Sequence, residues 1–486
     1  MKSKHSFYIF FLILSLFVIV SCNKTNYYKE GKIILQFSKD TILFDTVFSG
    51  VGSAVRYFKI KNTYNLPVNI SEIQLEKGNQ SKFNLNINGT PGNLAQDVEI
   101  GAKDSLYIFV NVTINTNNDD ILETDRIIFK TDKNEQAVNL EAFGQDVHFF
   151  RDSVIQSQTW TNDKPYLIYN SVALDKNQHL TIEAGTHIYS HRASRIMILG
   201  TLTVNGTFDN PVIFEADRLN GHSSIFDDVF DNDSTDNYYD VAGQWGGIWL
   251  TKLSSDNEIN YAVIKNADIG IQVDSVINSN PQLSIYNSII EHHSYAGILA
   301  QVSNIFATNC LISDCGYYNI ALTRGGNYNF YHCTIDNYWK GIRNTPAIFI
   351  NNYFSANGTT YVYDLENAYF GNCIIWGNKE TESVADGYAD QGVLFNYQFD
   401  NCILKIDPKS NINTNDISHY KNIILNSDPL FKDYYEYDFM LKENSPAINS
   451  GNIQITNLFP SLLNNDLNNV SRINDAAPDI GCYEFQ

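Results

Sequence analysis

A short pattern recurs between residues 259 and 404 and decides the fold. A small residue stands two positions before an isoleucine or leucine, as in Asn309-Cys310-Leu311-Ile312 and Asn372-Cys373-Ile374-Ile375. Six positions carry the small residue, at intervals of 26, 22, 23, 40 and 29 residues: Ala262, Ser288, Cys310, Cys333, Cys373 and Cys402. Self-similarity at a period of roughly 20–50 residues indicates a solenoid, propeller or other array.

Each repeat has the pattern of a β-strand followed by a corner. The small residue and the isoleucine are two apart, so they share one face of a strand. Residues that favour corners follow two positions later, because Asn and Asp tolerate the left-handed conformation of a tight turn: Asn266, His292, Asp314 and Asn337. A second short strand follows, as at Gly270-Ile271 and Gly297-Ile298. One coil is therefore predicted to be strand, corner, strand and loop.

The repeats, together with the corner residues that recur at the same position in successive coils, resemble the right-handed parallel β-helix superfamily, the pectate-lyase-like solenoids. The resemblance implies an all-β chain in which residues 147–427 form the β-helix. It does not by itself imply a function, because one fold serves many activities.

The first residues have the features of a bacterial export signal. Lys2 and Lys4 precede an apolar run over residues 7–20, which Ile19-Val20-Ser21-Cys22 closes. The closing residues resemble a lipobox. The resemblance implies that residues 1–21 are removed, that Cys22 is lipidated, and that residues 22–30 tether the protein to the cell envelope, in particular the outer membrane, with its periplasmic or surface face left open. The alternatives are an ordinary signal peptide or a short anchor helix.

Residues 31–146 contain short strands without the coil period. The alternation in Arg56-Tyr57-Phe58-Lys59-Ile60 is typical of a half-buried strand, and regularly spaced short strands indicate a β-sandwich. Phe58-Lys59-Ile60-Lys61-Asn62 and Leu140-Glu141-Ala142-Phe143-Gly144 resemble immunoglobulin-like domains of the ASPM/SPD-2/hydin type. The resemblance implies a spacer or docking module.

Residues 428–486 break the period. Ser445-Pro446-Ala447-Ile448-Asn449-Ser450-Gly451 and Pro478-Asp479-Ile480-Gly481-Cys482 resemble the C-terminal segment of the choice-of-anchor β-helix proteins of bacterial surfaces. A solenoid needs its last coil closed against edge-to-edge pairing. We therefore expect this segment to cap the β-helix.

The charge of the chain limits its partners. Thirty-three Lys and Arg against 54 Asp and Glu give a net charge of −21. This charge argues against nucleic acid or anionic lipid as a partner.

One insertion is rich in carboxylates and is a candidate Ca²⁺ site. Its spacing does not match an EF-hand loop, and the alternative is a solvated loop. No other cofactor is expected. The candidate ligands are Asp227, Asp228, Asp231, Asp233 and Asp236.

The cysteines of the repeat are predicted to be buried core thiols. Residues in register on parallel strands point the same way, which prevents both a disulfide and a tetrahedral zinc site. Cys315 and Cys482 do not occupy the small-residue position of the repeat and remain candidates for oxidation.

No catalytic residue is assigned, because neither the arginine motif of the pectate lyases nor the aspartate, histidine and arginine motifs of the polygalacturonases are present. A basic, aromatic cluster is predicted instead to bind an acidic glycan. Its members are Tyr317, Tyr318, Arg324, His332, Tyr338, Trp339, Lys340 and Arg343. The sequence favours a non-catalytic module that binds a polysaccharide or a surface protein. The alternatives are scattered surface side chains, or a polysaccharide lyase or glycosidase.

A second apolar row is predicted to point outward. It consists of Val263, Ile289, Leu311, Thr334, Ile374 and Ile403. Because such a row should not face water, we expect inserted loops or a partner to cover it. The 40-residue coil and residues 379–392 are the candidate loops.

Overall fold

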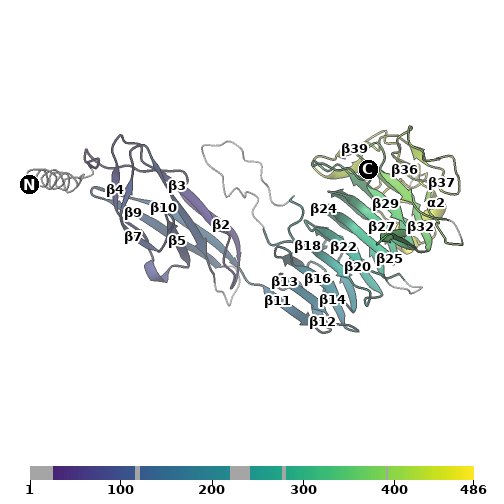
Figure 1. Cartoon of the computed structure of the whole chain (residues 1–486), viewed down its shortest axis with the longest axis horizontal. Coiled ribbons are helices and arrows are strands. Elements are labelled where there is room, and N and C mark those ends of the chain that lie inside the picture. The colour runs from purple at the N-terminus through teal and green to yellow at the C-terminus, as the bar shows by residue number, and fades with distance from the viewer. Residues whose placement is uncertain (1–25, 115–120, 219–240, 276–280, 390–391, 475) are drawn as a thin grey trace, which may run out of the picture. The chain divides into compact units, whose positions relative to one another are not determined.

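A computed structural model describes residues 26–114, 121–218, 241–275, 281–389, 392–474 and 476–486. The chain divides into two compact units, with the boundary between Asp146 and Val147. Strands make up nearly all of the regular structure in both units (Figure 1). Among the described residues, none of the helices has the length and apolar character needed to cross a membrane.

The first unit is a sandwich of two five-stranded sheets. One sheet has the order β1 (Gln36–Phe37), β3 (Arg56–Lys61), β8 (Ser105–Val112), β5 (Phe83–Ile87) and β6 (Thr90–Pro91). The other has the order β2 (Thr41–Phe48), β10 (Asn134–Gln145), β9 (Ile121–Thr131), β4 (Val68–Leu75) and β7 (Leu94–Ile100). Alternate residues point into a shared core, as Phe58 and Ile60 do from β3.

The second unit is a solenoid in which parallel strands stack in three columns (Figure 1). Column A contains β12 (Gln158–Trp160), β14 (His179–Glu183), β17 (Thr201–Asn205), β20 (Asn257–Asn260), β23 (Leu283–Tyr286), the ends of β25 (Ala296–Thr308) and β27 (Tyr318–Tyr331), β32 (Leu365–Gly371), β35 (Gln398–Asp400) and β37 (Tyr420–Lys421).

Column B contains β15 (His187–Ser190), β18 (Val212–Ala216), β21 (Ala262–Lys265), β24 (Ile289–His293), β26 (Leu311–Cys315), β28 (Thr334–Asn337), β33 (Ile374–Gly377), β36 (Ile403–Leu404) and β38 (Ile424–Leu425). Column C contains β16 (Arg195–Ile198), β19 (Gly247–Leu250), β22 (Ile269–Val273), the starts of β25 and β27, β29 (Ile348–Asn351) and β34 (Ser383–Asp386). The long strands β11 (His148–Ile155) and β13 (Tyr166–Leu174) begin columns B and C.

A left-handed residue divides each repeat that the sequence presented as a single strand. The residue before the small one turns the chain from column A to column B, with φ between 46° and 54° at Tyr261, Asn287, Asn309, His332, Asn372 and Asn401. The coil therefore has three strands rather than the two that were predicted. The predicted corner between columns B and C is confirmed at Asn266, His292 and Asp314, but Asn337 is not left-handed. Its side chain instead donates a hydrogen bond to the carbonyl of Cys315.

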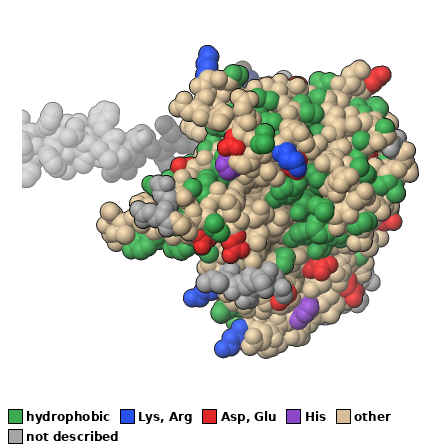
Figure 2. All heavy atoms as spheres, turned by 90° about the vertical axis from the view of Figure 1, so that its right-hand side faces the viewer, with side chains coloured by type: hydrophobic (Ala, Val, Ile, Leu, Met, Phe, Trp, Pro, Cys, Tyr) green, Lys and Arg blue, Asp and Glu red, His purple; other side chains and the backbone are tan. Residues whose placement is uncertain are grey.

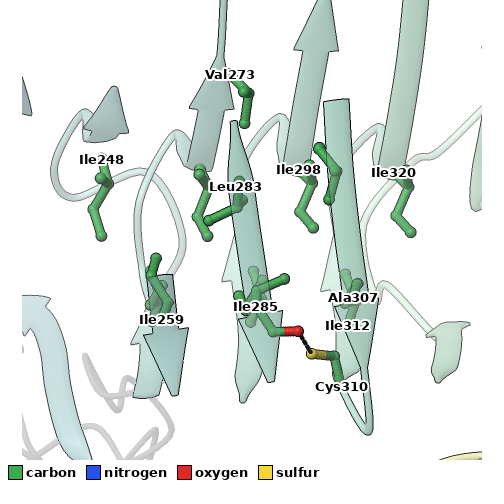
Figure 3. Close-up of a cluster of buried hydrophobic side chains, with 14 of the residues drawn as sticks. Ile248, Ile259, Val273, Leu283, Ile285, Ile298, Ala307, Cys310, Ile312 and Ile320 are labelled. Carbon is green, nitrogen blue, oxygen red and sulfur yellow. Dashed lines mark hydrogen bonds between the residues drawn. The ribbon is translucent and has the colours of Figure 1, made fainter. Parts of the chain in front are cut away.

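The solenoid core is apolar and confirms the predicted role of the cysteines. Figure 3 shows side chains from all three columns around one interior, among them Ile248 and Ile298 of column C, Ile259 and Ile285 of column A, and Ile312 of column B. Cys310, Cys333, Cys373 and Cys402 are fully buried free thiols within this core. Cys315 and Cys482 are buried free thiols too, and burial raises the pKa of both.

Much of the predicted outward row is covered, but by the end of the chain and not by the predicted loops. Leu311, Ile374 and Ile403 pack beneath residues from the end of the chain, namely Phe431, Phe439, Leu441, Ala447, Leu467, Ile480 and Cys482. This segment includes the hairpin of β39 (Phe431–Asp433) and β40 (Asp438–Leu441) and the single turns α2 (Ile453–Thr456) and α3 (Pro460–Leu463).

The C-terminal segment lies along the side of the coils. Its Gly481 and Cys482 N–H groups donate to Asn372 and Thr334, which belong to successive coils. The segment also contacts the last strand of column B through Ile424, and its role as a cap stays a prediction. The 40-residue coil instead carries a separate hairpin of β30 (Tyr353–Ala356) and β31 (Thr359–Val362). Figure 2, which faces the right-hand side of Figure 1, shows hydrophobic side chains gathered in the middle of that face.

Candidate functional sites

The structure does not bring the eight predicted glycan-binding residues together in one site. Tyr338, Trp339 and Lys340 line one pocket, and Arg324 lines a different groove. Tyr317 is exposed and packs against Tyr295, with ring centroids 5.2 Å apart. Tyr318 stacks on Phe349. The predicted single cluster is therefore not present.

The prediction is corrected for the other two residues, which are buried and cannot reach a ligand. His332 Nε2 accepts hydrogen bonds from Asn372 Nδ2 and from the hydroxyl of Thr456 in the C-terminal segment, both at 2.9 Å. Burial keeps the pKa of His332 well below its usual value. Arg343 is 2% exposed and forms a salt bridge to Glu382, with Nη2 2.7 Å from Oε1.

One hollow in the solenoid wall is a groove of about 440 Å³ that we call the Trp249 groove. Parallel pairing aligns Met197, Trp249 and Gln272 on successive coils of column C, so that their side chains share its outer face. The remaining lining residues are Leu199, Thr251, Lys252, Leu253, Asp274, Ser275, Gln301, Val302 and Arg324.

Hydrogen bonds fix the aromatic wall of this groove. The Trp249 Nε1–H donates to Asp274 Oδ2 at 2.7 Å, and Gln272 Nε2 donates to Asp274 Oδ1 at 3.0 Å. The guanidinium of Arg195 lies 5.9 Å from the Trp249 ring centroid. The indole is thus held in place while it remains partly exposed. A held, partly exposed aromatic ring offers a flat apolar surface at low cost in side-chain entropy.

Backbone strain gathers at one side of the Trp249 groove. Val302 has φ 46° and Arg324 has φ 63°, beside the irregularity where Gln301 and Ser303 pair with β27. Left-handed φ recurs at the corners of other coils, but it is an outlier for a β-branched residue such as Val302. The Arg324 N–H donates to Asn351 Oδ1 at 2.9 Å, and its guanidinium lies 4.3 Å from the Phe354 ring centroid.

A second hollow, of about 140 Å³, lies at the corner between columns B and C beneath the β39–β40 hairpin. We call it the Tyr437 pocket. Its lining residues are His292, Asp314, Tyr338, Trp339, Lys340, Gly341, Tyr434, Tyr435 and Tyr437. Tyr338 stacks on Tyr434 with centroids 4.0 Å apart, and the rings of His292 and Tyr437 are nearly perpendicular with centroids 4.3 Å apart.

Two buried ionisable residues form the inner wall of the Tyr437 pocket. Burial raises the pKa of Asp314 to about 7 and lowers that of His292 to about 4. Asp336 is fully buried near Asp314, and burial together with the Asp314 charge raises its pKa well above the usual value. Near neutral pH, His292 is therefore uncharged and Asp314 is close to its titration midpoint.

Sequence reasoning missed several of the residues that line these hollows. Trp249 had a usable signal, because it alternates with the buried Ile248 and Leu250 and so points outward. Tyr434, Tyr435 and Tyr437 form an aromatic run, but nothing in the sequence places that run beside His292. His292 and Asp314 were recognised as corner residues and not as part of a pocket.

The predicted lipidation site Cys22 and the candidate Ca²⁺ ligands Asp227, Asp228, Asp231, Asp233 and Asp236 lie outside the described residues. Within the part of the chain that the structure describes, no three His, Cys, Asp or Glu side chains are placed to hold a metal ion together.

The solved structures that the chain resembles include the following three. The chaperone DraB of E. coli is 9% identical with a TM-score of 0.17, and the match covers 24% of this chain and 55% of DraB. The PapD-like domain 7 of human CEP192 is 9% identical with a TM-score of 0.17, covering 26% of this chain and 95% of that domain. A protein of unknown function from Porphyromonas gingivalis is 11% identical with a TM-score of 0.17, covering 26% and 60%. No curated protein matches the chain.

The assignment of the fold therefore rests on the observed strands and on a family match within the solenoid. Residues 275–405 match the family model described as the right handed beta helix region. Together with the large parallel stack, the match shows that the chain is an all-β protein in which a sandwich is followed by a right-handed parallel β-helix.

Proposed function

We propose that this protein is a surface lipoprotein of the cell envelope whose β-helix binds an acidic glycan without cleaving it. The lipid on Cys22 anchors the protein to the membrane, and the Trp249 groove receives the glycan. The observation that carries the proposal is the Trp249 ring, fixed by Asp274 and flanked by Lys252 and Arg324 in one groove.

The chemistry of the groove suits an anionic sugar chain. The ring of Trp249 offers a flat surface for the apolar face of a sugar, and the amides of Gln272 and Gln301 offer hydrogen bonds to hydroxyl groups. Lys252 and Arg324 supply positive charge in a chain whose net charge is −21. The local charge therefore favours a glycan with carboxylate or sulfate groups.

The described lining residues of this groove do not include the paired carboxyl groups of a glycosidase. Hydrolysis of a glycosidic bond usually needs two carboxyl groups facing the scissile bond. Among the described lining residues, Asp274 is the one carboxylate, and both of its oxygens already accept hydrogen bonds. This arrangement supports binding rather than hydrolysis.

The test is a binding screen of the full chain against acidic and neutral polysaccharides, with analysis of the products. We expect Trp249→Ala to lower the affinity for the best acidic glycan roughly 10-fold or more, because a stacking contact is lost. Arg324→Ala should weaken binding more at low salt than at high salt. The matched control is Phe208→Ala, which removes an exposed ring elsewhere in the solenoid.

Two results would contradict this proposal. Equal binding by wild type and Trp249→Ala would remove the groove as the binding site. New unsaturated or reducing ends would replace binding with lyase or hydrolase activity, the alternative function for this fold.

The lipid anchor has its own test. Cells that express the protein are grown with labelled palmitate, and the label on the protein is measured. We expect labelling of the wild type and none of Cys22→Ser, while Cys482→Ser, a change at a buried thiol, keeps the label. Labelling of Cys22→Ser would exclude Cys22 as the anchor.

A further inference from the structure

The Tyr437 pocket contains buried polar groups whose hydrogen-bonding capacity is unmet. Asp314 is 4% exposed; its Oδ1 accepts the N–H of Tyr338 at 3.1 Å, whereas its Oδ2 has no hydrogen-bond partner among the described residues. His292 is 5% exposed, and neither ring nitrogen has a hydrogen bond within the described part of the chain. The nearest carboxylate oxygen, Glu291 Oε1, is 3.9 Å from His292 Nδ1.

Such unmet groups are rare in proteins and costly. The large majority of buried polar side-chain atoms have a partner, and an unpaired buried charge is strongly unfavourable. Beneath the pocket, neither carboxylate oxygen of Asp336 has a described partner. A ligand that brings N–H donors and positive charge would satisfy Asp314 and an acceptor nitrogen of His292 together.

The walls of the pocket also favour a cation. Tyr338, Trp339, Tyr434, Tyr435 and Tyr437 surround it, and aromatic faces attract ammonium groups. One ammonium already occupies such a position, because Lys340 Nζ lies 5.4 Å from the Tyr437 ring centroid. Lys340 is exposed, and its long side chain is free to move away at little cost.

The volume limits what enters. The pocket measures about 140 Å³, below the roughly 300–1,000 Å³ that holds a drug-sized ligand. It therefore takes one small end group and not a sugar chain.

We propose that the Tyr437 pocket binds a primary ammonium group on an aliphatic stem, the chemistry of a lysine side chain on a partner protein. The ammonium donates to Asp314 Oδ2 and to a ring nitrogen of His292, and the tyrosine rings surround the stem. The incoming group takes the place of Lys340. The Tyr437 pocket shares no lining residue with the Trp249 groove, so this inference stands apart from the proposed glycan site.

Binding should depend on pH through Asp314. The ammonium keeps its charge well above neutral pH, and His292, with a pKa near 4, stays neutral. Asp314, with a pKa of about 7, must lose its proton to attract the ligand, so affinity should rise from pH 6 to pH 8. The charged and titratable groups around Asp314 are Glu291 and His292 on β24, Asp336 on β28, Tyr338, Lys340, the Arg343–Glu382 pair, and Tyr434, Tyr435 and Tyr437 above.

The experiment titrates the full chain with n-butylamine and with Nα-acetyl-lysine amide, using n-butanol as the uncharged control. We expect both amines to bind and the alcohol not to bind. Asp314→Asn keeps an acceptor for the Tyr338 N–H and should lower amine affinity roughly 10-fold or more, because a charge-assisted hydrogen bond is lost. Asp132→Asn, which removes the same charge from an exposed turn, should have no effect.

Lys340→Ala gives the most decisive result, because the direction of the change in affinity differs between ligand classes. Removing the competing ammonium should raise amine affinity, whereas a carboxylate ligand would lose affinity. Absence of amine binding, equal binding by Asp314→Asn, or weaker binding by Lys340→Ala would each overturn the proposal. Stronger binding of glucosamine than of Nα-acetyl-lysine amide would replace the lysine partner with an amino sugar.

Discussion

Arg343 and Glu382 form a buried, bidentate ion pair in the solenoid wall. Two guanidinium nitrogens of Arg343 donate to the two carboxylate oxygens of Glu382, at 2.7 and 2.8 Å. The guanidinium also donates to the carbonyl groups of Thr345 and Asn337 and to the side chain of Asn378. Glu382 in turn accepts the N–H groups of Ala347 and Lys379. The pair therefore joins the 40-residue coil to the segment that follows it.

Replacing Arg343 should destabilise the solenoid strongly. Arg343→Leu leaves the Glu382 charge buried without its partner, which typically costs about 3–5 kcal/mol. Denaturant unfolding measures the effect, and Arg192→Leu, at an exposed arginine, is the matched control. A loss no larger than that of the control would show that the pair contributes little.

Asp314 should make stability fall as pH rises. Its pKa in the folded protein is raised to about 7 by burial, whereas the unfolded carboxyl titrates near 4. The unfolded state therefore releases its proton first, and the contribution of Asp314 to folding stability declines between about pH 4 and pH 7. Asp314→Asn removes this decline. We expect the free energy of unfolding of the variant, relative to that of the wild type, to be higher at pH 8 than at pH 4. An unchanged difference would contradict the raised pKa.

The sequence identified Arg343 and His332 as charged and polar residues but gave no means of knowing that they are buried. Their environments depend on distant residues: Glu382 is 39 positions from Arg343, and Thr456 is 124 positions from His332. Tyr338, Trp339 and Lys340 were correctly predicted to be near one another, since they are adjacent in the chain. Their neighbours Tyr434 and Tyr437 are supplied by a segment whose position only the folded structure reveals.

At the scale of elements, the outward apolar row was predictable because it follows from strand alternation. Cys310, Cys333 and Cys373 point inward and Leu311 and Ile374 point outward, as the sequence predicted. The corner inside the repeat was not predictable, because Tyr286 and Ile289 on its two sides read as one continuous strand. The φ of 48° at Asn287 divides them.

Removing apolar surface from this row should release the C-terminal segment. Leu311 and Ile374 are 3% and 1% exposed beneath it. Changing both to Ser places two hydroxyl groups in an apolar layer and removes two buried side chains, at a cost of about 2–5 kcal/mol for each. We expect limited proteolysis to cut residues 428–486 faster in this double variant. The control is Ile342→Ser, at a side chain that is 91% exposed. Cleavage at the wild-type rate would mean that polar contacts alone hold the segment.

At the scale of the whole molecule, the two units have separate hydrophobic cores. Phe58 belongs to the sandwich core, and its ring lies 6.2 Å from that of Phe129. Phe370 belongs to the solenoid core, stacked between Phe330 and Phe399 at 4.9 and 5.0 Å. Each coil of the solenoid contacts mainly the coils next to it, so the stability of the solenoid is a sum of contributions from the coils and from their interfaces. The sandwich has no such repeat and should unfold as one cooperative unit.

Two matched substitutions test whether the units unfold separately. Each phenylalanine is fully buried, so replacement by alanine should cost about 3–5 kcal/mol in the unit that contains it. We expect calorimetry to resolve two transitions. Phe58→Ala should lower the transition temperature of the sandwich alone, and Phe370→Ala that of the solenoid alone. If either substitution lowered both transition temperatures equally, the two cores would be coupled, and the sandwich would not be an independently folding unit.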